Sequence, residues 1–225
     1  VHELFPEVPE EISSLIDQLL EKDPNIPENR RAALSTIRLS SEHLADLIEG
    51  LLDISRIEAG RLELERNEVP LDSLLDELVS MFSMQAESKG IALHYEKLST
   101  IPAQVKTDQK RLKQILINLL SNAIKYTHQG GISIIVTLKG RQLTIDVKDT
   151  GIGISSDFQH KLFQSWQREN KSAAKGSGIG LVIAKMLADA MGLNLSLENS
   201  SASGSCFRLC QNNYQHKAQR VLLIE

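Results

Sequence analysis

The sequence has few aromatic residues, few cysteines and no long apolar run, and each shortage excludes a class of protein. Its longest apolar stretches, such as residues 115–124, are interrupted by polar residues and fall short of the ~20 residues that a membrane-spanning helix needs. Two cysteines, Cys206 and Cys210, are too few for a disulfide framework and lack metal-ligand spacing. We therefore expect no membrane span in this chain, and we expect both cysteines to be buried strand residues in a reducing compartment.

Positive charge is not in excess either. Lys and Arg total 25 against 29 for Asp and Glu, which gives a formal net charge of −4, and no basic stripe is present to neutralise a phosphate backbone. We therefore expect no nucleic-acid partner. The chain starts with Val1 and shows no signal peptide, so we expect it to be part of a longer protein.

Aromatic residues make up 4% of the chain, and residues 1–66 contain only Phe5. Leu and Ile supply the apolar side chains of this segment instead, alongside many Glu and Arg residues. Such a composition is typical of helices that pack through ridges of aliphatic side chains.

Two helices are predicted in this first segment. From Asn29 to Glu65 the apolar residues recur at alternating intervals of three and four, which predicts one helix about 50 Å long. Residues 9–22 predict a partner helix with Leu15 among its inward-facing residues, and the prolines of D-P-N-I-P at 23–27 close the hairpin. Because one short neighbour cannot bury so long a stripe, we predict that two chains pair into a dimeric four-helix bundle.

Pro70 marks a change to mixed helix and strand. Asp108 is a favourable N-cap for a helix that follows it, and K-G-R at 139–141 joins two alternating strands as a hairpin. The fold class is therefore α+β, with the helical hairpin followed by an α/β sandwich. Predicted helices are Leu71–Ser88, Asp108–Lys125 and Ile179–Met191, and predicted strands are Ile91–Leu98, Ile132–Leu138, Gln142–Lys148, Leu195–Glu198 and Ser205–Leu209.

Glycines cluster in two short segments, D-T-G-I-G-I at 149–154 and G-S-G-I-G-L at 176–181. At such junctions the absence of a Cβ lets backbone N–H groups approach a ligand, and a helix N-terminus attracts phosphate. Glycines alone are weak evidence for a phosphate site. The order of the motifs strengthens it, because a helix with Asn118 and Asn122 on one face precedes both segments.

Together these segments resemble the N, G1, F, G2 and terminal glycine boxes of sensor histidine kinases. The matching stretches are N-L-L-S-N-A-I-K-Y-T (118–127), D-T-G-I-G-I (149–154), L-F-Q-S-W (162–166), G-S-G-I-G-L (176–181) and G-S-C-F (204–207). Residues 42–60 also resemble the second dimerisation helix of that family. The resemblance implies the ATP-binding fold that histidine kinases share with gyrase, heat-shock chaperones and mismatch-repair ATPases.

The resemblance also implies the ligands and the residues that hold them. Asp149 would accept a hydrogen bond from the adenine amino group, Tyr126 would lie beside the adenosine, and the glycines of the second segment would bracket the triphosphate and hinge a lid at 167–177. Asn118 and Asn122 would hold Mg²⁺, because their amide oxygens suit a hard cation. The implied ATP-binding residues are Asn118, Asn122, Lys125, Tyr126, Asp149, Gly151, Gly153, Arg168, Gly176, Gly178, Gly180 and Leu181.

His2 is the predicted phosphate acceptor, with Glu3 holding the other ring proton. The segment H-E-L-F-P-E-V resembles the family's H-E-L-R-T-P-L box but departs from it at three consecutive positions, where Phe5, Pro6 and Glu7 stand. Related ATPases place a carboxylate where this chain has Asn118, and an amide cannot activate water as a base. The sequence therefore favours a kinase over an ATPase.

The expected function is thus an ATP-dependent protein-histidine kinase core of a hybrid two-component sensor, acting as a homodimer that passes phosphate to a receiver aspartate. Two alternatives remain: a regulatory module that pairs with another histidine kinase, and a free-standing ATPase. Expected domains are residues 1–66 for dimerisation and phosphotransfer, 67–214 for ATP binding, and 215–225 for a linker and the start of a receiver whose first acidic residue is Glu225. We expect this segment to be the cytoplasmic portion of a membrane-anchored sensor.

Overall fold

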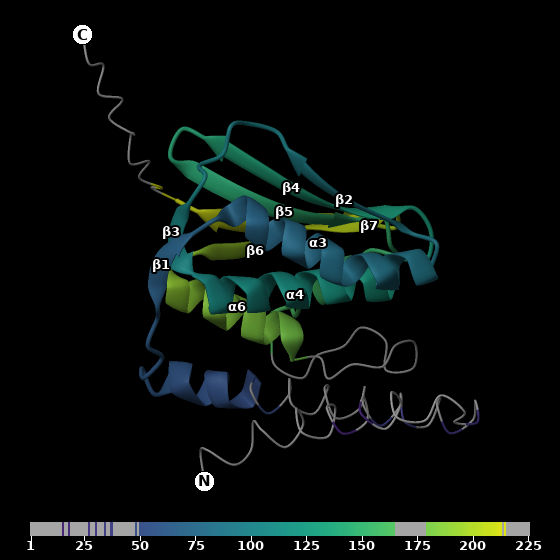
Figure 1. Cartoon of the computed structure of the whole chain (residues 1–225), viewed down its shortest axis with the longest axis horizontal. Helices are drawn as coiled ribbons and strands as arrows, with labels where there is room; N and C mark the ends of the chain where they lie inside the picture. The colour runs from purple at the N-terminus through teal and green to yellow at the C-terminus, as the bar shows by residue number, and fades with distance from the viewer. Residues whose placement is uncertain are drawn as a thin grey trace. The chain divides into compact units, whose positions relative to one another are not determined.

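The structure is a computed structural model, and it describes residues 15, 18, 27, 30, 34, 37, 48, 50–164, 179–212 and 214. The chain divides into two compact units, residues 1–61 and residues 62–225. Figure 1 shows the strands and helices of the second unit in colour. Of the predicted helix at 9–22, the structure describes residues 15 and 18. The predicted receiver segment at 215–225 lies outside the described residues.

In the first unit, residues 50–58 are helical, so the prediction that this helix continues to Glu65 is wrong. Gly60 takes a left-handed φ of 65°. Its N–H donates to the Ile57 carbonyl at 2.9 Å, and the Arg61 N–H donates to the Arg56 carbonyl at 2.8 Å. These are the two hydrogen bonds of a Schellman C-cap, which closes the helix where the apolar periodicity alone predicted that it would go on.

The second unit is an α/β sandwich with three long helices on one face of a five-stranded sheet (Figure 1). The strand order is β2-β4-β5-β7-β6; β2 pairs with β4 in parallel, and the other neighbours are antiparallel. The elements are β1 (Arg66–Val69), α3 (Leu71–Ser88), β2 (Ala92–Lys97), β3 (Val105–Asp108), α4 (Gln109–Tyr126), β4 (Gly131–Lys139), β5 (Gln142–Asp149), α5 (Ser156–Gln159), α6 (Gly180–Met191), β6 (Asn194–Ser201) and β7 (Gly204–Gln211).

The predicted helices and strands of this unit are confirmed to within a few residues. Asp108 caps α4 as expected, because its side chain accepts a hydrogen bond from the Arg111 N–H at 3.0 Å. Alternate residues of β4 are fully buried against the helices, which is the two-residue period expected for a strand with one covered face. Cys206 and Cys210 lie buried in β7 as free cysteines, also as predicted.

A two-stranded ribbon of β1 and β3 was not predicted. Both strands are four residues long and carry no clear apolar alternation. The pairing depends on distant contacts: the Glu65 N–H donates to Asp108 Oδ2 at 2.9 Å, and the Arg66 guanidinium donates to the Met191 carbonyl at 3.2 Å. Only the tertiary structure brings these partners together. None of the described helices has the length and apolar character needed to cross a membrane.

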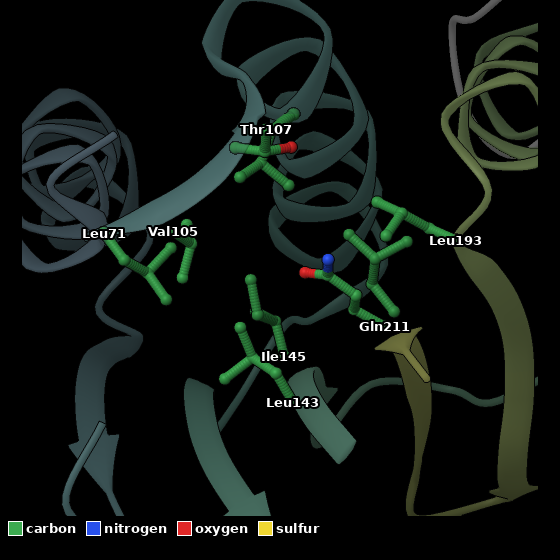
Figure 2. A pocket seen from close by; sticks show the side chains of 9 residues that line it. Leu71, Val105, Thr107, Leu143, Ile145, Leu193 and Gln211 are labelled. Carbon is green, nitrogen blue, oxygen red and sulfur yellow. The ribbon is translucent and has the colours of Figure 1, made fainter. Parts of the chain in front are cut away.

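A narrow cavity of about 20 Å³ lies between the sheet and the helices, and Figure 2 shows it between Leu143 of β5 and Thr107 of β3. This volume holds about one methyl group or one water molecule. Leu143 and Asp149 are six residues apart along β5, or about 20 Å. The cavity is therefore at the far end of that strand from the predicted ligand site. Its lining residues are Leu71, Val105, Thr107, Leu112, Leu143, Ile145, Leu193, Leu209 and Gln211.

Replacing Leu143 by Ala is expected to enlarge this cavity and to lower the free energy of unfolding by about 3 kcal/mol. Chemical denaturation measures the change. Val105→Ile is the matched control, because it adds a methyl group to the cavity wall and is expected to change the free energy of unfolding by less than about 1 kcal/mol. Equal stabilities of Leu143→Ala and the wild type would contradict the expected role of Leu143 in the core.

Candidate functional site

The candidate site is centred on Asp149, the last residue of β5. Its side chain is 7% exposed. The Gly151 N–H donates to Asp149 Oδ1 at 2.8 Å, and the Ser205 N–H donates to the same oxygen at 3.3 Å. Among the described residues, both backbone donors therefore engage Oδ1, which leaves Oδ2 for a donor on a ligand.

Burial raises the pKa of Asp149 above its usual value, while the two backbone N–H groups act in the opposite direction. Desolvation is the larger effect, since it penalises the charged form of a carboxylate that has no cationic partner among these contacts. A ligand that donates a hydrogen bond to Oδ2 would offset this penalty. Asp149 is thus suited to recognise a neutral N–H donor.

Residues that follow Asp149 are held closely against the end of α4. A Cβ on Gly151 would lie 2.5 Å from the Tyr126 carbonyl oxygen, so only glycine fits there. That carbonyl also accepts a hydrogen bond from the Ile152 N–H at 3.4 Å. Thr150 completes the attachment, because its hydroxyl accepts from the Gly131 N–H and donates to the Gln129 carbonyl, both at 2.9 Å. The loop after β5 is therefore fixed on two sides.

The predicted residues of α4 lie on the helix as the sequence indicated. Asn118 and Asn122 are half-buried, one turn apart, while the residues that follow each of them are buried in the core. Lys125 places its Nζ over the Tyr126 ring at 5.0 Å from the centroid, and Tyr126 is 39% exposed. The helix thus presents two amides, a cation and an exposed aromatic ring near the loop that carries Asp149.

The start of α6 meets α4 at Asn118. A Cβ on Gly180 would lie 2.7 Å from Asn118 Oδ1, so the glycine permits the side-chain amide to approach the N-terminus of this helix. Leu181, the next residue, is half-buried. The first N–H groups of a twelve-residue helix attract anions. The amide oxygen can bind a cation, and the neighbouring helix N-terminus can bind the anionic group that accompanies it.

The structure therefore brings together Asn118, Tyr126, Asp149, Gly151 and Gly180 through close contacts and hydrogen bonds, with Asn122 and Lys125 on the same helix as Asn118. Gly153 takes a φ of 68°, and a Cβ there would overlap with the Ser201 carbonyl oxygen. Other predicted site residues lie outside the described residues: His2, Glu3, Arg168, Gly176 and Gly178, together with the rest of the predicted lid at 167–177.

Sequence reasoning missed several residues that build the site. Ser205 lies in the motif G-S-C-F, but nothing in that motif indicates that its N–H donates to Asp149. Lys89 donates to the Ile124 carbonyl at 2.6 Å and so caps the last turn of α4, although it lies 35 residues away. Thr127 is fully buried at the end of α4, and its hydroxyl has no hydrogen-bond partner among the described residues. None of these contacts has a local signal in the sequence.

The three histidines that the structure describes do not form a site. His94, His128 and His160 are exposed, as predicted, while His43 and His216 lie outside the described residues. In the parts of the chain that the structure describes, no three His, Cys, Asp or Glu side chains are grouped so that they could hold a metal ion. The predicted protein ligands for a cation at this site stay the amide oxygens of Asn118 and Asn122.

Comparison with known proteins defines the class. Residues 107–214 match the model of the histidine kinase-, DNA gyrase B- and HSP90-like ATPase family, and this part of the chain belongs to that family. The matched range contains α4, the loop after β5, α6 and the β6–β7 hairpin, which are the elements that carry the candidate site.

Relatives place this ATPase domain with the histidine kinases. The chain is 38% identical over 186 residues to the signal transduction histidine-protein kinase BarA of Escherichia coli, which covers 79% of this chain and 20% of BarA. It is 35% identical over 190 residues to hybrid signal transduction histidine kinase B of Dictyostelium discoideum, which covers 81% of this chain and 10% of that protein. The chain therefore spans a fifth or less of the length of these relatives.

A solved structure supports the same assignment. The full-length structure of ShkA in complex with AMPPNP superposes with a TM-score of 0.73 and 26% identity, covering 92% of this chain and 46% of that one. The resemblance to sensor histidine kinases is thus confirmed. Because the relatives are named as kinases, the comparisons give no support to the alternative of a regulatory module.

Proposed function

We propose that this protein is the catalytic core of a hybrid histidine kinase, which transfers the γ-phosphate of ATP to a histidine and then to a receiver aspartate. One observation carries the ATP assignment: Asp149 is buried, receives two backbone N–H groups on Oδ1, and retains Oδ2 for a ligand donor. The adenine amino group is such a donor. The AMPPNP complex of ShkA supports a nucleotide as the ligand.

In this proposal each part of the site binds one part of ATP. Asp149 accepts from the adenine amino group, Gly151 and Gly153 let the base lie against the loop, and Tyr126 contacts the adenosine. The phosphates lie toward the N-terminus of α6, where Gly180 and Leu181 begin the helix. Further phosphate contacts are assigned to Lys125, Gly176 and Gly178 from their positions in the motifs, and to Arg168 from its position in the predicted lid.

The residues present fit a magnesium ion. The Gly180 backbone leaves space for Asn118 Oδ1 at the start of α6, and Asn122 lies one turn further along the same face of α4. Carboxamide oxygens are suitable Mg²⁺ ligands, and the ion keeps several waters and binds substrate phosphates as well. When bound, Mg²⁺ would neutralise charge that develops on the phosphate oxygens. Asn118 and Asn122 would hold it.

His2 is the proposed nucleophile, from its place in H-E-L-F-P-E-V. A neutral ring nitrogen of His2 attacks the γ-phosphorus, the bond from that phosphorus to the β-γ bridging oxygen breaks, and ADP leaves. Glu3 takes the proton from the other ring nitrogen. Because position 118 carries an amide rather than a carboxylate, the site lacks a base there to direct water at the phosphate. This difference favours transfer to histidine over hydrolysis.

The experiment that tests this function is incubation of the protein with γ-labelled ATP. Incorporation of phosphate that is stable in alkali and lost in acid is the expected result, because a phosphoramidate N–P bond is acid-labile. Transfer of the label to an isolated receiver domain tests the second step. Protein that binds ATP and acquires no label would contradict the kinase assignment.

We further propose the domain organisation of residues 1–66 for dimerisation and phosphotransfer, 67–214 for ATP binding and 215–225 leading to a receiver. A second copy of the chain is the proposed partner of the first segment. In a single chain Leu15 is 58% exposed, Ile37 53% and Leu51 46%. Aliphatic side chains left exposed along helical residues indicate a surface that a partner covers.

Replacing Ile37 by Glu is expected to convert the dimer to a monomer, because the charge would be buried in the partner interface. Light scattering coupled to gel filtration measures the mass, which should fall from twice the 25.0 kDa of one chain to that single value. Leu98→Glu is the matched control, since Leu98 is 65% exposed in the second unit and is expected to leave the dimer intact. A wild type that is monomeric at micromolar concentration would contradict the dimer.

A further inference from the structure

The turn between β6 and β7 lies directly against the loop that carries Asp149. A Cβ on Gly153 would overlap with the Ser201 carbonyl oxygen, and a Cβ on Gly204 would overlap with the Asp149 carbonyl oxygen. Two glycines, one in each segment, therefore allow the two backbones to come into contact. Contact alone does not fix the loop to the turn; a hydrogen bond between them is needed.

The hydroxyl of Ser200 makes that connection. Its Oγ accepts a hydrogen bond from the Ile154 N–H at 2.8 Å, which holds the far end of the loop. The same oxygen lies 3.1 Å from Ser205 Oγ and 3.4 Å from the Gly204 carbonyl, on the other side of the turn. Ser200 is half-buried and Ser205 is 5% exposed, so these hydrogen bonds are shielded from water.

Ser205 carries the connection on to Asp149. Its N–H donates to Asp149 Oδ1 at 3.3 Å, which is one of the two backbone hydrogen bonds that orient the carboxylate. A path of hydrogen bonds thus runs from Ile154, through Ser200 and Ser205, back to the start of the loop. Removing the Ser200 hydroxyl would release Ile154 and loosen the residue that holds Asp149 in place.

We propose that Ser200 is a positioning residue for ATP, which sets nucleotide affinity by fixing the Asp149 loop against the β6–β7 turn. The proposal rests on the proposed function, because it assigns Asp149 to adenine. Ser200 does not contact the base itself. It acts through Ile154 and Ser205, so that Oδ2 of Asp149 stays directed toward the ligand.

The test compares the ATP dissociation constants of the full chain and its Ser200 variants, measured by calorimetry. Ser200→Ala is expected to weaken binding by about 3- to 10-fold, the effect of losing one shielded hydrogen bond. Ser200→Thr keeps the hydroxyl and is expected to restore binding to within about twofold of the wild type. Ser203→Ala is the matched control, because Ser203 is exposed in the same turn and, among the described residues, its hydroxyl bonds within the turn, to Ser201 Oγ at 2.8 Å.

The outcomes separate the two proposals. Wild-type protein that fails to bind ATP would contradict the proposed function, and the role of Ser200 with it. Wild-type protein that binds ATP while Ser200→Ala binds equally well would contradict the role of Ser200 alone. Equal weakening in Ser200→Ala and Ser200→Thr, or in Ser200→Ala and Ser203→Ala, would show a general effect on the turn and would also overturn the proposal. Thermal unfolding confirms that each variant is folded at the temperature of the titration.

Discussion

Asp149→Asn is expected to weaken ATP binding by about 10- to 100-fold, since a hydrogen bond to a charged acceptor is lost. The geometry makes this substitution selective. The amide oxygen of Asn can replace Oδ1 and still accept from Gly151 and Ser205. The amide NH₂ then takes the place of Oδ2, where it opposes the adenine amino group with a second donor. Titration of the nucleotide followed by calorimetry measures the loss.

The thermal stability of Asp149→Asn distinguishes this loss of ATP binding from misfolding. Burial raises the pKa of Asp149, so the folded state favours its protonated form. The contribution of such a group to stability is greatest below its unfolded pKa and declines as the pH rises through the folded value. At neutral pH the wild type therefore bears the cost of a buried charge, and the Asn variant is expected to unfold at the same or a higher temperature.

The pH dependence of binding supplies a second readout. As the pH falls through the raised pKa of Asp149, Oδ2 gains a proton and ceases to accept, so wild-type affinity for ATP is expected to fall at a less acidic pH than an ordinary carboxylate would give. In Asp149→Asn this component should be absent. Asp189→Asn is the control, because Asp189 is 56% exposed at the end of α6 and pairs with Lys185. Equal affinities of the Asp149 variant and the wild type would contradict the assignment of adenine to this carboxylate.

His2→Gln is expected to abolish incorporation of phosphate from ATP while leaving ATP affinity unchanged. Gln has the size and polarity of His but no ring nitrogen that can act as a nucleophile. The measurement is the acid-labile label per chain after incubation with γ-labelled ATP.

His43→Gln provides the matched control for this acceptor. His43 lies in the predicted dimerisation helix, and its replacement is expected to preserve labelling. Full labelling of His2→Gln would exclude His2 as the acceptor and would place the phosphorylated histidine elsewhere. Loss of labelling in both variants would indicate that the helical segment, rather than one nucleophile, is needed.

The site is assembled from four elements that are far apart in the sequence. The carboxylate comes from the end of β5, the amides from α4, the helix N-terminus from α6 and one of the orienting N–H groups from β7. Glycines at 151, 153, 180 and 204 stand where a Cβ would meet a neighbouring element. The glycines therefore permit close contacts between elements as well as the approach of a ligand.

The sequence by itself determined the elements of the second unit and the chemistry of the candidate residues. Periodicity placed α3 at Leu71–Ser88, and the N-cap rule placed the start of α4 after Asp108. These features are local, because side-chain spacing and capping act within one element. Local signals also placed Asp149 at the end of a strand and Asn118 on one face of a helix.

One missed feature is also local: the helix before Gly60 ends in a Schellman cap, which a left-handed glycine permits and apolar periodicity does not reveal. Only the tertiary structure decided the rest. The β1–β3 ribbon, the Ser205 N–H on Asp149 and the Ser200 hydroxyl on Ile154 all join residues more than 35 positions apart. No local pattern encodes such contacts, because they form only after the sheet and helices have packed. The sequence thus identified the groups that would meet ATP, and the packing of distant elements decided how those groups are oriented.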